Sequence, residues 1–142
     1  MYNNIRYMNI INDDMDTIYK NIADEFCKNY YLLSENNLET VQPLFEPECS
    51  FDINGTKITG YNNLLNFYNY NNVYNISYDI ANISSHNINS DIIINVVGRL
   101  KINNNDYDIK NFSETFYLRY SYFDKIKNQY IYFINKHILT TF

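Results

Sequence analysis

The spacing of apolar residues changes partway along this chain, and that change constrains its fold more than any other feature. In the first part of the chain, apolar side chains recur at every fourth position, as they do on one face of an α-helix. After Val73 the spacing becomes two, which is typical of strands with one buried face. A chain that is helical first and stranded later favours an α+β fold, with its helices gathered on one face of an antiparallel sheet. The helical stripe consists of Ile18, Ile22, Phe26 and Tyr30.

Three helices are expected before the long strands. The stripe predicts a single helix over residues 17–33, which begins near Asp14 because acidic residues favour a first helical turn. Apolar residues at helical spacing predict a short second helix over 38–45 that ends by Pro47, and a third helix over 61–68.

A hairpin is expected between the second and third helices. Asn54-Gly55 separates two short strands, and this dipeptide favours a type I′ turn because both residues accept a positive φ. Alternating apolar residues then predict long antiparallel strands, with residues 84–90 as a loop. The expected strands cover residues 49–53, 57–59, 74–80, 92–102, 112–120 and 129–141.

Composition limits the class of protein. A chain of 142 residues fits one domain, which we assign to residues 14–142 after a flexible extension over residues 1–13. The net charge is −5 and the 11 basic residues are scattered, which disfavours nucleic acid as a partner. No apolar run approaches the roughly 18 residues of a membrane span, so no membrane partner is expected either.

Few residues carry chemistry. Cys27 and Cys49 lack the paired spacing of a zinc site, and we expect them to be small buried residues in a reducing compartment. His86, in the expected loop, and His137 are expected to be surface or structural residues. The chain has only three glycines and no glycine-rich phosphate loop. We therefore expect neither a metal nor another cofactor.

Four segments, in their order along the chain, resemble the nuclear transport factor 2 family. They are the opening helix Ile18–Phe26 with the aromatic pair Tyr30-Tyr31, the hairpin Ser50–Gly60, the central strand Val96–Lys101 and the following strand Phe112–Leu118. The resemblance implies a cone-shaped α+β fold, in which three N-terminal helices pack on a strongly bent antiparallel sheet.

The resemblance also implies a function. It points to a non-catalytic adaptor in nucleocytoplasmic transport, which binds Ran-GDP, Phe-Gly nucleoporin repeats or both as a dimer. Such an adaptor works in the cytoplasm and the nucleus and at the pores of the nuclear envelope. Two alternatives stay open. One is an mRNA-export cofactor that forms a heterodimer with a large export receptor, and the other is a small isomerase or dehydratase with its site inside the cone.

The resemblance assigns four binding positions in this sequence. Tyr19 takes the place of a tryptophan that contacts Phe-Gly repeats. Asn54 takes the place of an acidic residue that meets Ran, and Asn-Gly at this position resembles the export cofactor class. Asp106 and Asp108 loosely match an acidic loop that also meets Ran, although the loop is longer here.

Aromatic residues on the strands predict a dimer interface. Tyr117, Tyr130 and Tyr132 are expected on the open face of the bent sheet. Tyrosine is enriched at protein interfaces because its ring is apolar and its hydroxyl forms hydrogen bonds.

An enzyme would need an acid or a base inside the cone. Asp52 is expected to be exposed beside the hairpin, and Glu114 is the only acid on the strand faces assigned to the interior. Two interpretations of Glu114 remain open. We expect it to point to solvent or to a dimer interface, with the strand phase off by one. In the other interpretation it lies inside, where burial raises a carboxyl pKa and suits it to acid–base chemistry.

Overall fold

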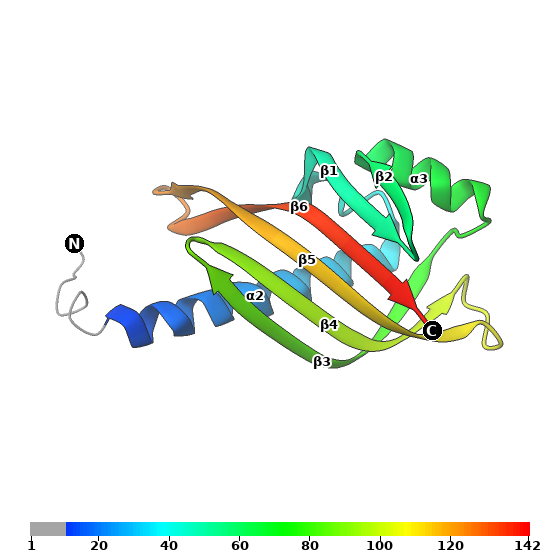
Figure 1. Ribbon diagram of the computed structural model, residues 1–142, viewed down its shortest axis with the longest axis horizontal. Coiled ribbons are helices and arrows are strands. Elements are labelled where there is room, and N and C mark those ends of the chain that lie inside the picture. The colour runs from blue at the N-terminus through cyan, green and yellow to red at the C-terminus, as the bar shows by residue number, and fades with distance from the viewer. Residues whose placement is uncertain (1–10) are drawn as a thin grey trace.

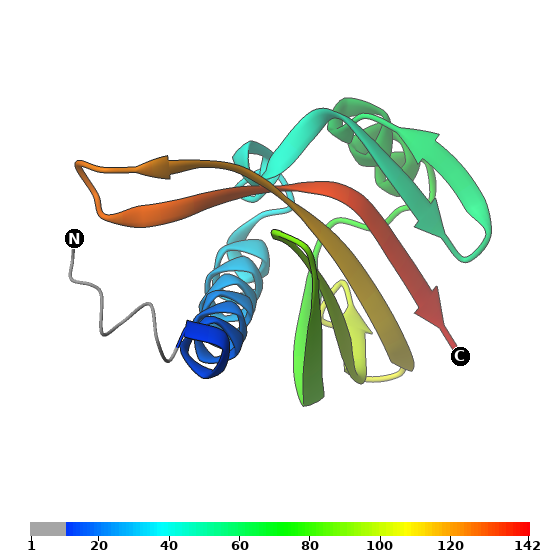
Figure 2. The same ribbon diagram turned by 60° about the vertical axis from the view of Figure 1, so that its left-hand side comes forward.

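A long helix lies in the hollow of a curved sheet in the computed structural model, which describes residues 11–142 (Figure 1). Helix α2 spans Ile11–Asn36 and α3 spans Tyr61–Tyr70. Figure 2 shows α2 on the concave side of the sheet, while α3 lies beside the β1–β2 hairpin. The six strands are β1 (Phe45–Ile53), β2 (Thr56–Thr59), β3 (Ile76–Ile88), β4 (Asp91–Ile102), β5 (Ile109–Asp124) and β6 (Gln129–Thr141).

The apolar stripe of α2 holds the helix against the sheet, which confirms the single helix predicted over residues 17–33. Tyr30 is buried, and its ring centre lies 4.8 Å from that of Phe116 on β5. Phe26 meets the same Phe116 ring edge-on at 5.2 Å. The helix begins at Ile11 rather than near Asp14, and residues 1–10 of the expected extension lie outside the described residues.

The prediction of a short second helix over residues 38–45 is wrong. This segment forms a turn and one 3₁₀ turn, Gln42–Leu44, so the described residues contain two α-helices and not three. The strand begins at Phe45, earlier than expected, because the ring of that residue is buried between Phe51 and Tyr61 at 5.2 and 4.8 Å. Burial of this ring against the sheet outweighs the weak helical spacing of the segment.

The sheet has the order β2-β1-β6-β5-β4-β3, and one of its pairs is parallel. The long strands from β3 to β6 pair antiparallel with one another, as predicted. β1 and β6 run parallel, which corrects the expectation of a wholly antiparallel sheet. The parallel pair is possible because the chain between these strands crosses through α3 and four further strands.

Asparagine performs in this chain the task that glycine usually performs in turns. Among residues 11–142, the non-glycine residues with positive φ are all asparagines. Asn54 and Gly55 have φ of 51° and 90°, as the predicted hairpin turn requires. Asparagine tolerates this region better than other residues with side chains. A chain with three glycines can therefore still form tight turns. The six asparagines are Asn54, Asn72, Asn89, Asn103, Asn104 and Asn128.

A bulge in β3 bends the sheet around the helix. The register of β3 against β4 shifts between Ile80 and Asn82, next to Gly98. A Cβ atom on Gly98 would lie 2.2 Å from the carbonyl oxygen of Asp79, so the two backbones approach closely only because this residue is glycine. β3 also extends through residues 84–88, which were expected in a loop, and His86 therefore lies in a strand.

No helix among residues 11–142 has the length and apolar character needed to cross a bilayer.

Candidate functional site

Three buried polar side chains join the helix to the sheet. Glu114 on β5 accepts a hydrogen bond from the Tyr31 hydroxyl of α2 at 2.5 Å, and it lies 2.5 Å from Nε2 of His137 on β6. Glu114 is 0% and His137 2% exposed. The expectation that Glu114 points to solvent or to an interface is therefore wrong, because the strand phase places it inside. His137 is a structural residue, which was one of the two roles expected for it.

The chemistry of a carboxylate fixes the direction of these bonds. A carboxylate only accepts hydrogen bonds, so the Tyr31 hydroxyl and His137 Nε2 both donate to Glu114. The other ring nitrogen of His137, Nδ1, is buried and has no hydrogen-bond partner among the described residues. The imidazole is enclosed by aromatic rings instead, stacked 4.9 Å from Phe116 and edge-on to Phe51 at 5.6 Å.

The surroundings of Glu114 are apolar and aromatic. Burial, and next the charge of Glu114, raises the pKa of Tyr30, Tyr31 and Tyr78 well above the usual value for tyrosine. The same two causes raise the pKa of the Cys27 thiol to about 12. These hydroxyl and thiol groups therefore stay protonated at neutral pH, and Glu114 is the acidic centre of the interior.

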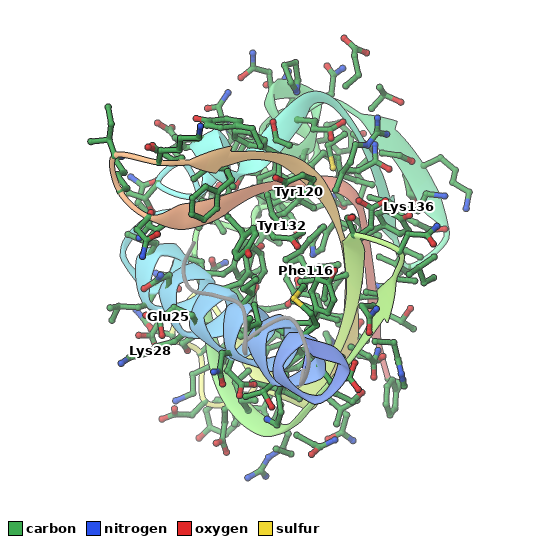
Figure 3. All side chains as sticks on the ribbon, turned by 90° about the vertical axis from the view of Figure 1, so that its left-hand side faces the viewer. Glu25, Lys28, Phe116, Tyr120, Tyr132 and Lys136 are labelled. Atoms are coloured by element: carbon green, nitrogen blue, oxygen red, sulfur yellow. The ribbon has the colours of Figure 1, made fainter. Side chains whose placement is uncertain are left out.

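The cone has a small hollow at its mouth, and Glu114 does not reach it. The hollow has a volume of about 180 Å³ and is lined by α2 and by tyrosines of β5 and β6. Figure 3 shows Tyr120 and Tyr132 projecting into the space between helix and sheet, with Phe116 deeper along the same strand face. Phe116 and Leu118, both 0% exposed, lie between Glu114 and Tyr120 along the inward face of β5, so buried apolar side chains separate the mouth from the cluster on this strand. Neither Glu114 nor His137 lines this hollow or any of four others over the described residues.

The opposite, convex face of the sheet has no helix over it in the part of the chain that the structure describes (Figure 1). Side chains that alternate with the buried ones on β4, β5 and β6 form this outer face, and they meet in cross-strand pairs such as Ile93 with Tyr117 and Thr115 with Ile138. A carboxylate, Asp91, lies at the edge of this face, where it accepts the Tyr117 hydroxyl and the Tyr120 N–H. The outer face is formed by Ile93, Asn95, Val97, Ser113, Thr115, Tyr117, Lys136 and Ile138.

The three tyrosines predicted on one open face do not share it. Tyr117 lies on the outer face, where its hydroxyl donates to Asp91 at 2.9 Å. Tyr130 and Tyr132 line the hollow at the mouth, on the helix side of the sheet. The prediction of a common face is wrong because register shifts after Tyr117 and Tyr120 interrupt the alternation that it assumed.

Asn54 is engaged within the fold. Its side-chain Oδ1 accepts the Thr141 N–H at 2.8 Å, and its Nδ2 donates to the Thr141 hydroxyl at 3.0 Å. The side chain therefore ties the β1–β2 turn to the end of β6. A partner that bound Asn54 would compete with both of these bonds.

The two predicted acidic residues lie in the β4–β5 turn, and both have cationic neighbours. Lys101 donates to Asp106 at 2.7 Å, and Lys110 lies 3.5 Å from Asp108. Tyr19 is half-buried in the mouth hollow, whereas this turn lies at the other end of the sheet (Figure 1). The structure therefore separates Tyr19 from Asp106 and Asp108.

The remaining candidates have ordinary environments. The Asp52 carboxylate accepts bonds from Lys57 and the Gly55 N–H, which lower its pKa. His86 is exposed on β3. Cys27 and Cys49 are buried free thiols, as expected. No group of three or more potential metal ligands occurs among the described residues.

Sequence reasoning found Glu114 and missed its two partners. Tyr31 was noticed only as part of an aromatic pair, and His137 only as a histidine near the chain end. The signal that finds them is the register, since Phe116 opposite His137 places the imidazole on the inward face beside Glu114.

Comparison with known proteins places this fold. Its structure resembles nuclear transport factor 2 from Cryptosporidium parvum, with a TM-score of 0.71 and 20% identity over 87% of this chain and 94% of that one. It resembles a chain of the complex "Sac3N peptide bound to Mex67:Mtr2", with a TM-score of 0.62 and 12% identity over 87% and 99%. It also resembles a dehydratase-like protein of Streptomyces avermitilis, with a TM-score of 0.64 and 13% identity over 92% and 98%. These identities support a common fold only.

The sequence itself carries the family assignment. No curated protein matches it significantly. Residues 22–136 match the profile of the nuclear transport factor 2 (NTF2) domain. This span includes Tyr31 and Glu114 of the buried cluster and ends one residue before His137. The chain therefore belongs to the nuclear transport factor 2 domain family.

Proposed function

We propose that this chain is a non-catalytic binding module, which pairs with a second copy or with a related domain through the outer face of its sheet. The observation that carries the proposal is the contrast between the two faces. The concave face is filled by α2 and by aromatic rings, and Glu114, the acid inside it, is fully buried. The convex face is uncovered in the part of the chain that the structure describes, and it presents Ile93, Val97, Tyr117 and Ile138. Asp91, a carboxylate at its edge, is bonded to the Tyr117 hydroxyl. Such a mixture of apolar and neutral side chains is typical of an interface core.

We further propose that the module is an adaptor in nucleocytoplasmic transport, in the cytoplasm and nucleus and at nuclear pores. Family membership and the likeness to a nuclear transport factor 2 support this role. Tyr19, half-buried at the mouth, is the proposed contact for Phe-Gly repeats. Asp106 and Asp108 are the proposed contacts for Ran-GDP.

A heterodimer is the second candidate arrangement. The likeness to a chain of the Mex67:Mtr2 complex favours it, since that complex joins two different proteins and binds a Sac3N peptide. In this arrangement the same outer face binds a related domain of an mRNA-export receptor, and the isolated chain stays monomeric.

An isomerase or dehydratase is the third candidate, and the buried cluster is the observation that favours it. A carboxylate, an imidazole and a tyrosine hydroxyl within hydrogen-bond distance are suitable groups for acid–base catalysis. A catalyst must also admit its substrate, and the buried Phe116 and Leu118 lie between the cluster and the mouth along β5. The binding function is therefore favoured by the closed interior.

We expect the purified chain to form a dimer that buries more than about 1,000 Å² in total. Ile138→Arg places a charge in the middle of the outer face, so the variant should be a monomer at concentrations where the wild type is a dimer. Size-exclusion chromatography with light scattering measures the difference. Tyr107→Arg is the matched control, because Tyr107 is 99% exposed in the β4–β5 turn. A wild type that stays monomeric at high micromolar concentration contradicts self-association and leaves the heterodimer.

Ran-GDP should bind weakly. Asn54 lacks a charge and is bonded to Thr141, and loss of one charge-assisted hydrogen bond lowers affinity about 10- to 150-fold. Asn54→Asp keeps the acceptor for the Thr141 N–H, so it should tighten binding in calorimetric titrations. Asp106→Asn with Asp108→Asn should weaken binding further, whereas Asp79→Asn, an exposed acid on β3, should not. If the wild type binds Ran-GDP tightly and the substitutions of Asp106 and Asp108 leave that affinity unchanged, the Ran site lies elsewhere.

The two histidines of the chain provide an internal test of the closed interior. Diethyl pyrocarbonate should modify exposed His86 in the native protein and leave His137 unmodified, because His137 is 2% exposed. Peptide mass spectrometry reads both sites in one sample, and both should react after denaturation. If His137 reacts as fast as His86 in the native protein, the interior opens to small molecules and the enzyme candidate gains support.

A further inference from the structure

The β5–β6 hairpin projects beyond the rest of the sheet. In Figure 2 it extends past α2 and past the β3–β4 hairpin. The turn at its apex is well defined, because the Asp124 carboxylate accepts the N–H groups of Ile126 and Lys127 at 3.0 and 3.1 Å. This turn presents Ile126 at 97% exposure, which is an unusual position for an isoleucine with no partner in the described residues.

Charge at the apex is opposite to the charge of the whole chain. The 28 residues after Glu114 contain four cations and one acid, Asp124, in a chain of net charge −5. Lys125 and Lys127 flank Ile126 directly, and neither forms an ion pair with the described residues. Asp124 is occupied by the two backbone N–H groups of the turn. The apex therefore presents two unpaired cations beside one exposed apolar side chain.

Aromatic side chains lie on β5 next to the apex, on the side toward the body of the sheet. Tyr122 and Phe123, just before the turn, are 52% and 37% exposed. An apolar tip, flanking lysines and an aromatic band form an order that matches the layers of a bilayer surface. Apolar groups enter the acyl boundary, lysines reach the headgroups and aromatic rings prefer the interface.

We propose that the apex of the β5–β6 hairpin is a peripheral docking site for an anionic lipid bilayer. Ile126 enters the boundary between headgroups and acyl chains, Lys125 and Lys127 lie among lipid phosphates, and Tyr122 and Phe123 lie at the interface. The expectation of no membrane partner was based on the lack of a long apolar run in the sequence. Such a run is needed to span a membrane, and the proposed contact only touches its surface. The inference is independent of the proposed adaptor function.

The size of the apex favours a bilayer over a macromolecular partner. A stable protein interface uses about 800 Å² of each partner, which a turn of a few residues does not offer. Single-stranded RNA is bound in a cationic groove along several nucleotides, whereas the apex has two unpaired lysines and no groove. A fluid lipid surface needs only a small, protruding contact that combines charge with an apolar side chain.

Vesicle co-sedimentation of the full chain tests the proposal. The wild type should bind vesicles of phosphatidylcholine with phosphatidylserine and not vesicles of phosphatidylcholine alone. Lys125→Ala with Lys127→Ala should lower partitioning about 30-fold, at about 1 kcal/mol for each lysine. Ile126→Ser should lower it about tenfold without changing charge.

The matched control is Lys28→Ala with Lys110→Ala, which changes the net charge equally. Lys28 lies on the outer side of α2 (Figure 3), and Lys110 begins β5 at the end away from the apex. This control should bind within about twofold of the wild type, because screening limits the reach of surface charges to about 8 Å. An equal loss in the control, or no wild-type binding to phosphatidylserine vesicles, overturns the proposal. It is also overturned if oligouridine RNA, measured by fluorescence polarisation, binds through Lys125 and Lys127 while the vesicles do not bind.

Discussion

The rest of the structure depends on one buried carboxylate. Glu114 lies on the inward face of β5. It accepts one hydrogen bond from Tyr31 of the helix and another from His137 of β6. Removing one partner of a buried polar group costs about 1–3 kcal/mol, and more when the group is charged, which is a large fraction of the roughly 5–15 kcal/mol that stabilises a typical domain. The cluster therefore fixes where α2 lies against the sheet. It also explains how a charged residue is tolerated in an aromatic interior.

Use of the interior for packing determines where the molecule can meet partners. Phe116 lies between the mouth and Glu114, and its ring contacts Phe26, Tyr30 and His137. A substrate that entered from the mouth along β5 would meet buried side chains before it reached the carboxylate. The proposed pairing with a second domain therefore uses the outer face of β4, β5 and β6. Structures that resemble this chain include a nuclear transport factor 2 and a dehydratase-like protein, and the packing around Phe116 is the reason that we propose the binding role.

Much of the fold could be predicted from the sequence, because local patterns determine it. The four-residue stripe located α2, Asn54-Gly55 located the hairpin turn, and alternation located the long strands. The short helix near residue 40 was wrong because burial of Phe45 outweighs local spacing. The parallel pairing of β1 with β6 has no local signal. In the site, the shared face of Tyr117, Tyr130 and Tyr132 failed at register shifts, which alternation alone does not reveal. The partners of Glu114 depend on register between distant segments.

The most direct test of the closed, carboxylate-centred interior is proton NMR of the two hydrogen bonds to Glu114. The account predicts two downfield proton signals in water that exchange slowly, from the Tyr31 hydroxyl and from His137 Nε2–H. Tyr31→Phe should remove one signal and His137→Phe the other, while His86→Phe should leave both. Absence of both signals in a folded wild type, or their rapid exchange with water, would show that the interior is open and would contradict the account.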